Sequence, residues 1–229
     1  MSAIEFTDAD IDIEVRGADD PPLIRLFRHP GAAYGLPAEA HRNGRFDPPP
    51  GDKGLFATLY TADNIAAAAM ECRILQANSR DEYSYTLKRA GSYKVVRFKY
   101  QEPALFIRVD RDVKRKLGIP AFTIDYSPFQ RAAKALFERY GNTVHGLSWE
   151  SFHRGQPGRN YGFWHHRKDA IALEPLQQEA DCPELLKDAD WIHLLRDYPV
   201  IELQPDEDPP PDVAPASTPA PAAAAPKTT

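Results

Sequence analysis

A strand pattern runs directly into an alanine-rich helix that carries a glutamate where its apolar pattern predicts core. Residues 59–74 read LYTADNIAAAAMECRI. Asp63 is a suitable N-cap, and the good helix formers after it predict a helix from Asn64 to about Gln76. On such a helix Glu71 lies among apolar neighbours, because residues three and four positions apart share a face. These neighbours are Ala67, Ala68, Ile74 and Leu75.

A carboxylate on that face is costly unless it is paired, hydrogen-bonded or used in chemistry. Glu71 therefore has two interpretations. It is a structural group that accepts backbone hydrogen bonds and holds a loop, or it is a functional group, since perturbed carboxylates favour functional sites. The alanines around it would let another molecule approach closely.

Composition indicates an ordinary soluble protein. The chain has 229 residues, enough for one sizeable core, with 42% hydrophobic residues and a net charge of −5. That charge argues against a broad nucleic-acid-binding face. Two distant cysteines, Cys72 and Cys182, form neither a disulfide framework nor a zinc pattern, which suits a reducing cytoplasm. Without a signal peptide or an apolar run of about 20 residues, we expect a cytoplasmic protein with no membrane contact.

The composition changes along the chain and predicts three segments. Residues 1–20 are acidic and look peripheral, residues 21–204 carry the mixed patterns of a folded domain, and residues 205–229 are rich in proline and alanine. The last segment has almost nothing able to build a core, so we expect a disordered tail.

Strand and helix patterns interleave within the middle segment. Alternation predicts strands, and 3.6-residue spacing predicts helices, the first of which ends at Gly141 as C-cap. Strands are expected at 55–60, 92–101, 104–112, 144–152 and 161–166, and helices at 129–141 and 183–198. The regular period of a doubly wound sheet is missing. The predicted class is α/β (α+β), one domain with a mixed sheet.

Common catalytic motifs are absent or broken. Neither GxGxxG after a strand nor GxxxxGK[ST] occurs. His165 and His166 would point to opposite faces of a strand, so we expect no metal site. GLSWE half resembles a nucleophile elbow, but Glu150 replaces the second glycine of that sharp turn.

What remains is a set of side chains suited to an anionic, ring-bearing ligand. They are Arg25, Arg28, Arg45, Tyr60, Glu71 and Ser151. A guanidinium grips phosphate, an aromatic ring stacks on a base, and a carboxylate stabilises developing positive charge. The alternatives are that Arg45 bonds loop carbonyls and that Tyr60 is a core tyrosine with a satisfied hydroxyl.

The run NGRFDPPPG…LYTADNIAAAAMEC closely resembles the signature of the RES domain, named for its arginine, glutamate and serine. Family members read GGRWNxxG, LYxA and then AxxE, which places Arg45, Tyr60 and Glu71 in the motif. FRHP resembles the family's opening strand and points to Arg28 more than Arg25. GLSWES resembles the late segment that brings the serine, here Ser151. The resemblance spans roughly residues 23–170.

The resemblance implies a twisted mixed sheet like that of ADP-ribosyltransferases and a bacterial toxin that consumes NAD as its substrate. ADP-ribose would pass to water, phosphate or a protein acceptor. The implied partner is an Xre-like antitoxin that covers the active site. The sequence departs from the family in the longer loop PPPGDKGLFA between Arg45 and Tyr60.

The resemblance also implies roles for the site residues. Glu71 would stabilise the oxocarbenium-like state of the nicotinamide ribose, and Arg45 with Arg28 would bind the pyrophosphate. Tyr60 would orient the nicotinamide, and Ser151 would hydrogen-bond the ribose or the amide. Positioning and electrostatics could suffice without a metal. The alternative is a binding module that kept the fold and lost the chemistry.

Overall fold

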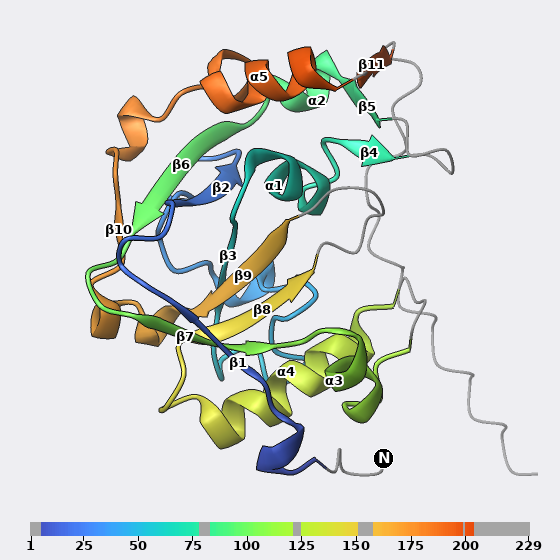
Figure 1. Cartoon of the computed structure of the whole chain (residues 1–229), viewed down its shortest axis with the longest axis vertical. Coiled ribbons are helices and arrows are strands. Elements are labelled where there is room, and N and C mark those ends of the chain that lie inside the picture. The colour runs from blue at the N-terminus through green and yellow to red at the C-terminus, as the bar shows by residue number, and fades with distance from the viewer. Residues whose placement is uncertain (1–5, 78–82, 121–124, 151–157, 199, 204–229) are drawn as a thin grey trace, which may run out of the picture.

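A curled eight-stranded sheet with the order β1-β7-β8-β9-β3-β2-β6-β10 forms the centre of the molecule (Figure 1). This computed structural model describes residues 6–77, 83–120, 125–150, 158–198 and 200–203. β7 and β8 are parallel and the other neighbours are antiparallel, so the sheet is mixed, as expected. Its strands are β1 (Ile13–Arg16), β2 (Leu23–Phe27), β3 (Thr58–Ala62), β6 (Lys94–Lys99), β7 (Ala104–Arg108), β8 (Gly146–Glu150), β9 (Arg159–Trp164) and β10 (Glu174–Pro175).

A second, three-stranded sheet lies at one end of the molecule and was not predicted. It has the order β11-β5-β4, and its strands are β4 (Gln76–Ala77), β5 (Tyr83–Thr86) and β11 (Val200–Leu203). The helices beside it are α2 (Leu87–Ala90) and α5 (Ala189–Asp197) (Figure 1). The helix α1 (Ile65–Glu71) contacts β2, β3, β9 and α5, and its alanines are buried in the core that joins the two sheets. Small side chains permit this close packing on several sides of one helix.

Two further helices cover the sheet where β7, β8 and β9 lie. They are α3 (Arg111–Lys116) and α4 (Ser127–Tyr140), drawn at the bottom of Figure 1. α4 ends at Tyr140 with Gly141 as its C-cap, as predicted. The aromatic residues of this core hold the long loop before β3 at both ends. Phe46 packs on Trp149 with ring centroids 4.6 Å apart, and Phe56 stacks on Phe137 at 4.5 Å.

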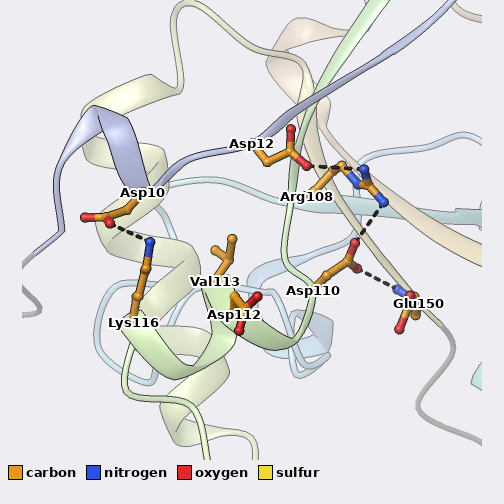
Figure 2. A pocket seen from close by; sticks show the side chains of 8 residues that line it. All are labelled: Asp10, Asp12, Arg108, Asp110, Asp112, Val113, Lys116 and Glu150. Atoms are coloured by element: carbon orange, nitrogen blue, oxygen red, sulfur yellow. Dashed lines mark hydrogen bonds and ion pairs between the residues drawn. The ribbon is translucent and has the colours of Figure 1, made fainter.

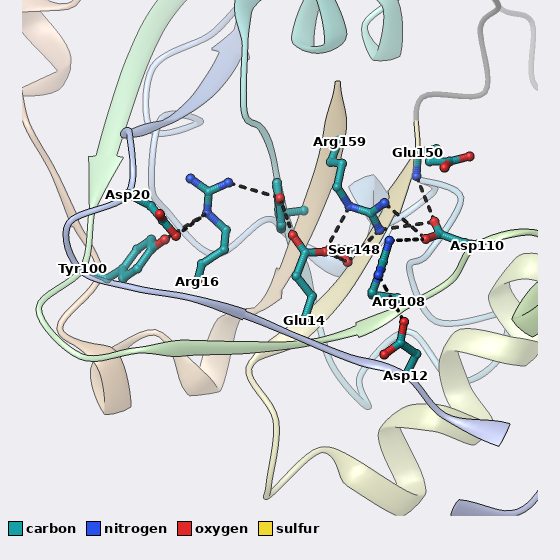
Figure 3. Close-up of polar contacts among 11 residues, drawn as sticks. Asp12, Glu14, Arg16, Asp20, Tyr100, Arg108, Asp110, Ser148, Glu150 and Arg159 are labelled. Atoms are coloured by element: carbon teal, nitrogen blue, oxygen red, sulfur yellow. Dashed lines mark hydrogen bonds and ion pairs between the residues drawn. The ribbon is translucent and has the colours of Figure 1, made fainter. Parts of the chain in front are cut away.

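The opposite face of the sheet carries a further apolar cluster. Short 3₁₀ helices occur at several places in the described chain. The 3₁₀ helices are Asp8–Asp10, Glu39–His41, His165–Arg167, Asp169–Ile171, Glu179–Asp181 and Leu185–Lys187. A polar network on this face fastens the edge strand β1 to the sheet (Figure 3). Glu14 accepts hydrogen bonds from the Tyr161 and Ser148 hydroxyls, each 2.7 Å long, and lies 3.0 Å from Arg159 Nε.

The helix α1 differs from its sequence-based prediction at both ends. The N-cap is Asn64 rather than Asp63, because the Asn64 side chain accepts from the Ala67 N–H at 2.8 Å. The helix ends at Glu71 rather than near Gln76, because Arg73 takes a left-handed conformation with φ of 54°. This turn lets the chain reverse, and the Ile74 N–H returns to the Ala69 carbonyl at 2.8 Å.

Other expectations had mixed outcomes. The predicted strands and helices of the large sheet are present with shifted ends, but His165 and His166 lie in a 3₁₀ helix after β9 rather than on the strand. The proline-rich segment 205–229 lies outside the described residues. Within the described ranges, no helix is long and apolar enough to cross a membrane.

Candidate active site

The Glu71 carboxylate lies beside the side-chain amide of Asn160, which projects from β9. Asn160 Nδ2 donates to Glu71 Oε2 at 3.4 Å. Glu71 is half-buried at the C-terminal end of α1, whereas Asn160 is only 1% exposed. The Asn160 Oδ1 atom is buried and has no hydrogen-bond partner within the described part of the chain. A buried acceptor without a donor is costly, so this oxygen is suited to a donor group of a ligand or a water.

A small cavity of about 40 Å³ opens where α1 meets β2, β3 and β9. Glu71 and Asn160 line it together with Arg25, Tyr60 and Cys72. This volume holds one or two water molecules, which is also enough for a ligand hydroxyl. Burial raises the pKa of the Cys72 thiol to about 11, so the group is protonated at neutral pH and is a poor nucleophile.

Tyr60 connects this cavity to the glycine–arginine loop. Its hydroxyl oxygen accepts from the Phe46 N–H at 2.9 Å. Gly44 lies so close that a Cβ there would be 2.4 Å from the Tyr60 hydroxyl, which leaves room only for glycine. Burial raises the pKa of Tyr60 well above its usual value, with Asp47 and Glu71 adding to this effect and Arg45 opposing it. Tyr60 thus has the satisfied hydroxyl of a core tyrosine and also lines the cavity.

The strands β2 and β3 pair through a single residue pair in the described structure, Ile24 with Ala62. Arg25 fills the gap beyond that pair. Its Nη1 donates to the Tyr60 carbonyl and its Nε to the Ala32 carbonyl, both at 3.0 Å. A guanidinium therefore supplies to β3 a hydrogen bond that a neighbouring strand would supply.

The other predicted arginines lie on either side. Arg28 is exposed just after β2, with its guanidinium carbon 5.2 Å from the centre of the Tyr93 ring. Arg45 is half-buried, with its guanidinium carbon 5.4 Å from the ring centre of Tyr126 and 5.2 Å from that of Phe129. All three distances fit cation–π contacts. Arg25, which the resemblance disfavoured, lines the cavity, and Arg28 does not.

Tyr126 joins two arginines of the site. Its ring faces Arg45, and its hydroxyl accepts from Arg73 Nη2 at 3.2 Å. Arg73 follows Glu71 by two positions, so Tyr126 links the end of α1 to the glycine–arginine loop. The predicted Ser151 lies outside the described residues. Ser127, next to Tyr126, donates its hydroxyl to Asp125 Oδ1 at 2.7 Å.

Sequence reasoning missed Asn160 and Tyr126, and it ranked Arg25 below Arg28. Asn160 lies in GRNYGF, which reads as an ordinary strand. Its face depends on register: Asn160 pairs with Ala62, and only that pairing turns it toward α1. A polar residue between buried strand residues was the one available signal.

A larger hollow of about 630 Å³ lies elsewhere, lined by Asp10, Asp12, Asp110, Asp112, Glu150, Arg108, Lys116 and Val113 (Figure 2). Its carboxylates would repel a phosphate. Several of them are already paired: Asp10 lies 2.7 Å from Lys116, and Asp12 and Asp110 each lie 3.2 Å from Arg108. Among the described residues, no group of three or more histidines, cysteines or carboxylates could hold a metal ion.

A search of curated proteins found no match. A chain in the crystal structure of the M. tuberculosis MbcT–MbcA toxin–antitoxin complex has a similar fold, with a TM-score of 0.52 and 20% sequence identity. The similarity covers 74% of this chain and 86% of that chain. The model of the RES domain matches residues 22–188. Since that match spans most of the sequence, the chain belongs to the RES domain family.

Proposed function

We propose that this protein is the toxin of a toxin–antitoxin pair and that it cleaves NAD at the bond between nicotinamide and ribose. The observation that carries the proposal is the half-buried Glu71 carboxylate, which lies with Asn160, Tyr60 and Arg25 around one small cavity. The family and the structural similarity to a toxin–antitoxin complex support the same conclusion.

The cavity would receive part of the nicotinamide riboside end of NAD. Its volume of about 40 Å³ suits a hydroxyl rather than a whole nucleotide, so the rest of NAD would lie outside it. Asn160 Oδ1, which is buried without a donor, would accept from a ribose hydroxyl. Tyr60 and the loop that it anchors would orient the ring, and Ser151 stays a predicted contact.

The pyrophosphate would lie toward Arg45. Arg73 lies on the same side, since both arginines contact Tyr126. Guanidinium groups bind phosphate oxygens in bidentate geometry and gain from partial burial. Arg28 would reach the site from the other side, beyond Cys72.

Cleavage would proceed through an oxocarbenium-like state. The electron pair of the C–N bond passes to the nicotinamide nitrogen, which neutralises its ring, and positive charge develops on the ribose. Glu71 would stabilise that charge electrostatically. Water, phosphate or a protein side chain would then bond to the ribose carbon, giving a glycohydrolase, a phosphorylase or an ADP-ribosyltransferase.

The deciding experiment is nicotinamide release from NAD by the purified, partner-free protein, with and without phosphate. Glu71→Gln keeps the size of the side chain and removes its charge, and we expect at least a ~100-fold loss of rate. Glu102→Gln changes an exposed glutamate and serves as the matched control. Full activity of Glu71→Gln would remove the proposed role of the carboxylate. Phosphate dependence, or labelled protein from labelled NAD in cell extract, would identify the acceptor.

We further propose that the antitoxin, of the Xre-like type, covers this site. A carboxylate at the end of an inserted segment would suit the arginines. Arg45→Ala is expected to weaken both NAD turnover and antitoxin binding. Loss of one with the other fully retained would show that the two do not share the site.

A further inference from the structure

A second pocket lies at the opposite end of β3 and β9 from Glu71. It has a volume of about 510 Å³ and is lined by residues of the loop before β3, the end of β9 and α4. Asn160 and His165 mark the two sites along one strand and its continuation. With a strand rise of ~3.3 Å per residue, five residues separate them by roughly 16 Å. The volume is within the range of small-molecule sites, ~300–1,000 Å³.

His165 presents a polar ring to this pocket. The residue is 9% exposed and lines the pocket, and its backbone N–H is held by the Ala57 carbonyl at 2.9 Å. Its imidazole makes no hydrogen bond in the described part of the structure. Burial, together with the charges of Lys168, Arg25 and Arg42, lowers the pKa of His165 to about 3. The ring is therefore neutral at pH 7, with one donor and one acceptor to offer.

Two buried cations stand beside it. Lys168 is 9% exposed, donates to the Tyr34 carbonyl at 3.0 Å and lies 3.5 Å from the centre of the Tyr34 ring. Arg42 is 7% exposed and donates through Nε to the Pro37 carbonyl at 3.1 Å and through Nη1 to two more carbonyls. Within the described ranges neither cation forms an ion pair, and Arg42 Nη2 has no partner. Asp169 acts on Lys168 and Asp47 acts on Arg42 only at longer range, without a direct ion pair. An anion that contacts both cations directly would therefore gain from their buried positive charge.

Asn142 and His166 also line the pocket, and much of the remaining wall is apolar. Phe56 and Phe137 form part of the wall, and Leu36 and Leu55 stand at the rim. These leucines are 64% and 41% exposed and present apolar surface at the mouth of the pocket. An inorganic anion would satisfy the cations but would leave this apolar surface in water.

We propose that this pocket binds a small organic acid, with its carboxylate at Lys168, Arg42 and His165 and an apolar ring or chain against Phe137 and the two leucines. The carboxylate accepts from the ammonium, from Arg42 Nη2 and from the imidazole N–H. Burial of the apolar part then adds to binding. One molecule thus supplies both the counter-ion for the buried cations and the apolar group for the wall.

The test uses the full chain and two probes of the same shape, 3-phenylpropionate and the neutral 3-phenylpropan-1-ol. Titration calorimetry measures affinity, and the imidazole signals in proton–carbon NMR spectra report the site. We expect the acid to bind and to shift the His165 signal, and the alcohol to bind at least ~10-fold more weakly. Inorganic phosphate should bind more weakly than the acid, because it lacks the apolar part.

Rim variants locate the binding. Leu55→Glu puts a carboxylate at the exposed rim and should weaken binding of the acid at least ~10-fold through like-charge repulsion. Leu87→Glu changes an equally exposed leucine, 47% exposed on α2, and should leave binding unchanged. Lys168→Met tests the buried cation directly, with circular dichroism to verify folding.

Three results would overturn the proposal. The first is no binding of the acid at concentrations of ~10 mM. The second is equal binding of the acid and the alcohol, which would remove the anion from recognition. The third is binding that Arg45→Ala abolishes and Leu55→Glu does not, which would place the acid at the candidate active site.

Discussion

The Asn160 amide donates to the Glu71 carboxylate across 3.4 Å, although the two residues lie 89 positions apart in the sequence. One comes from the end of a helix and the other from the start of a strand. The contact leaves Asn160 Oδ1 buried and unpaired among the described residues. A carboxylate held by one half of an amide, with the other half available to a ligand, is the central relationship of the site.

Asn160→Asp should reduce nicotinamide release by at least ~10-fold at neutral pH while leaving the fold intact. The change keeps the shape of the side chain but places a second carboxylate beside Glu71, and like charges at this distance favour protonation of one of them. The rate should recover partly at higher pH, where both groups ionise. A pH–rate profile that matches the unchanged protein would contradict the proposed coupling.

Tyr60→Phe should destabilise the protein by about 1–3 kcal/mol, because the buried Phe46 N–H loses its acceptor. The same change should raise the KM for NAD more than it lowers kcat, since the loop that carries Arg45 loses its anchor. Urea unfolding and steady-state kinetics measure the two effects. Tyr198→Phe alters a 43%-exposed tyrosine and is the control. Equal stability of Tyr60→Phe and the unchanged protein would show that the loop is held elsewhere.

Asp188→Ala should cost about 3 kcal/mol of folding free energy. Asp188 is 3% exposed, accepts two hydrogen bonds from Arg97 at 2.8 and 2.9 Å and caps α5 through the Asp190 N–H. Arg97 keeps Asp190 as a second partner, which limits the loss.

The matched change for that prediction is Asp197→Ala. It removes an exposed ion pair with Arg196, whose members are 55% and 66% exposed. Such pairs contribute roughly 0–1 kcal/mol. The free energy of unfolding, measured by chemical denaturation, should therefore fall much more in Asp188→Ala than in Asp197→Ala. Similar losses in the two variants would mean that burial does not decide the strength of the Arg97 pair.

Because of His165, we expect the protein to be less stable at acidic pH than at neutral pH. The pKa of His165 is about 3 in the folded protein and about 6.5 in the unfolded chain, so protons bind preferentially to the unfolded chain between these values. The stability contributed by the neutral ring is complete above pH 6.5 and is lost as the pH falls toward 3. One proton corresponds to a slope of about 1.4 kcal/mol per pH unit.

His165→Gln should flatten the dependence of unfolding free energy on pH within that window, whereas His193→Gln, at an exposed position, should not. Urea titrations at several pH values measure the slopes. An unchanged slope in His165→Gln would indicate that this ring is protonated in the folded protein at ordinary acidic pH.

The local sequence pattern was sufficient for α4, because the buried face of that helix follows from the spacing of apolar residues along the chain. The spacing of Phe129, Ala132, Ala133 and Leu136 predicted α4, and all four are buried. The pattern failed at the end of α1, where Arg73 in a left-handed conformation stops the helix against its own sequence preference. The bond from Arg73 to Tyr126 helps to offset that cost, and no local signal reports such a distant partner.

The sequence by itself determined the mixed α/β class, the family and the three residues of the motif, Arg45, Tyr60 and Glu71, because these depend on residue type and local spacing. Only the tertiary structure decided which side chains surround them. Asn160 faces Glu71 because β9 pairs with β3 in one register, and Arg25 reaches the cavity because β2 and β3 diverge after one pair. A register shift by one residue would turn Asn160 to the other face, and register is a property of contacts between distant strands.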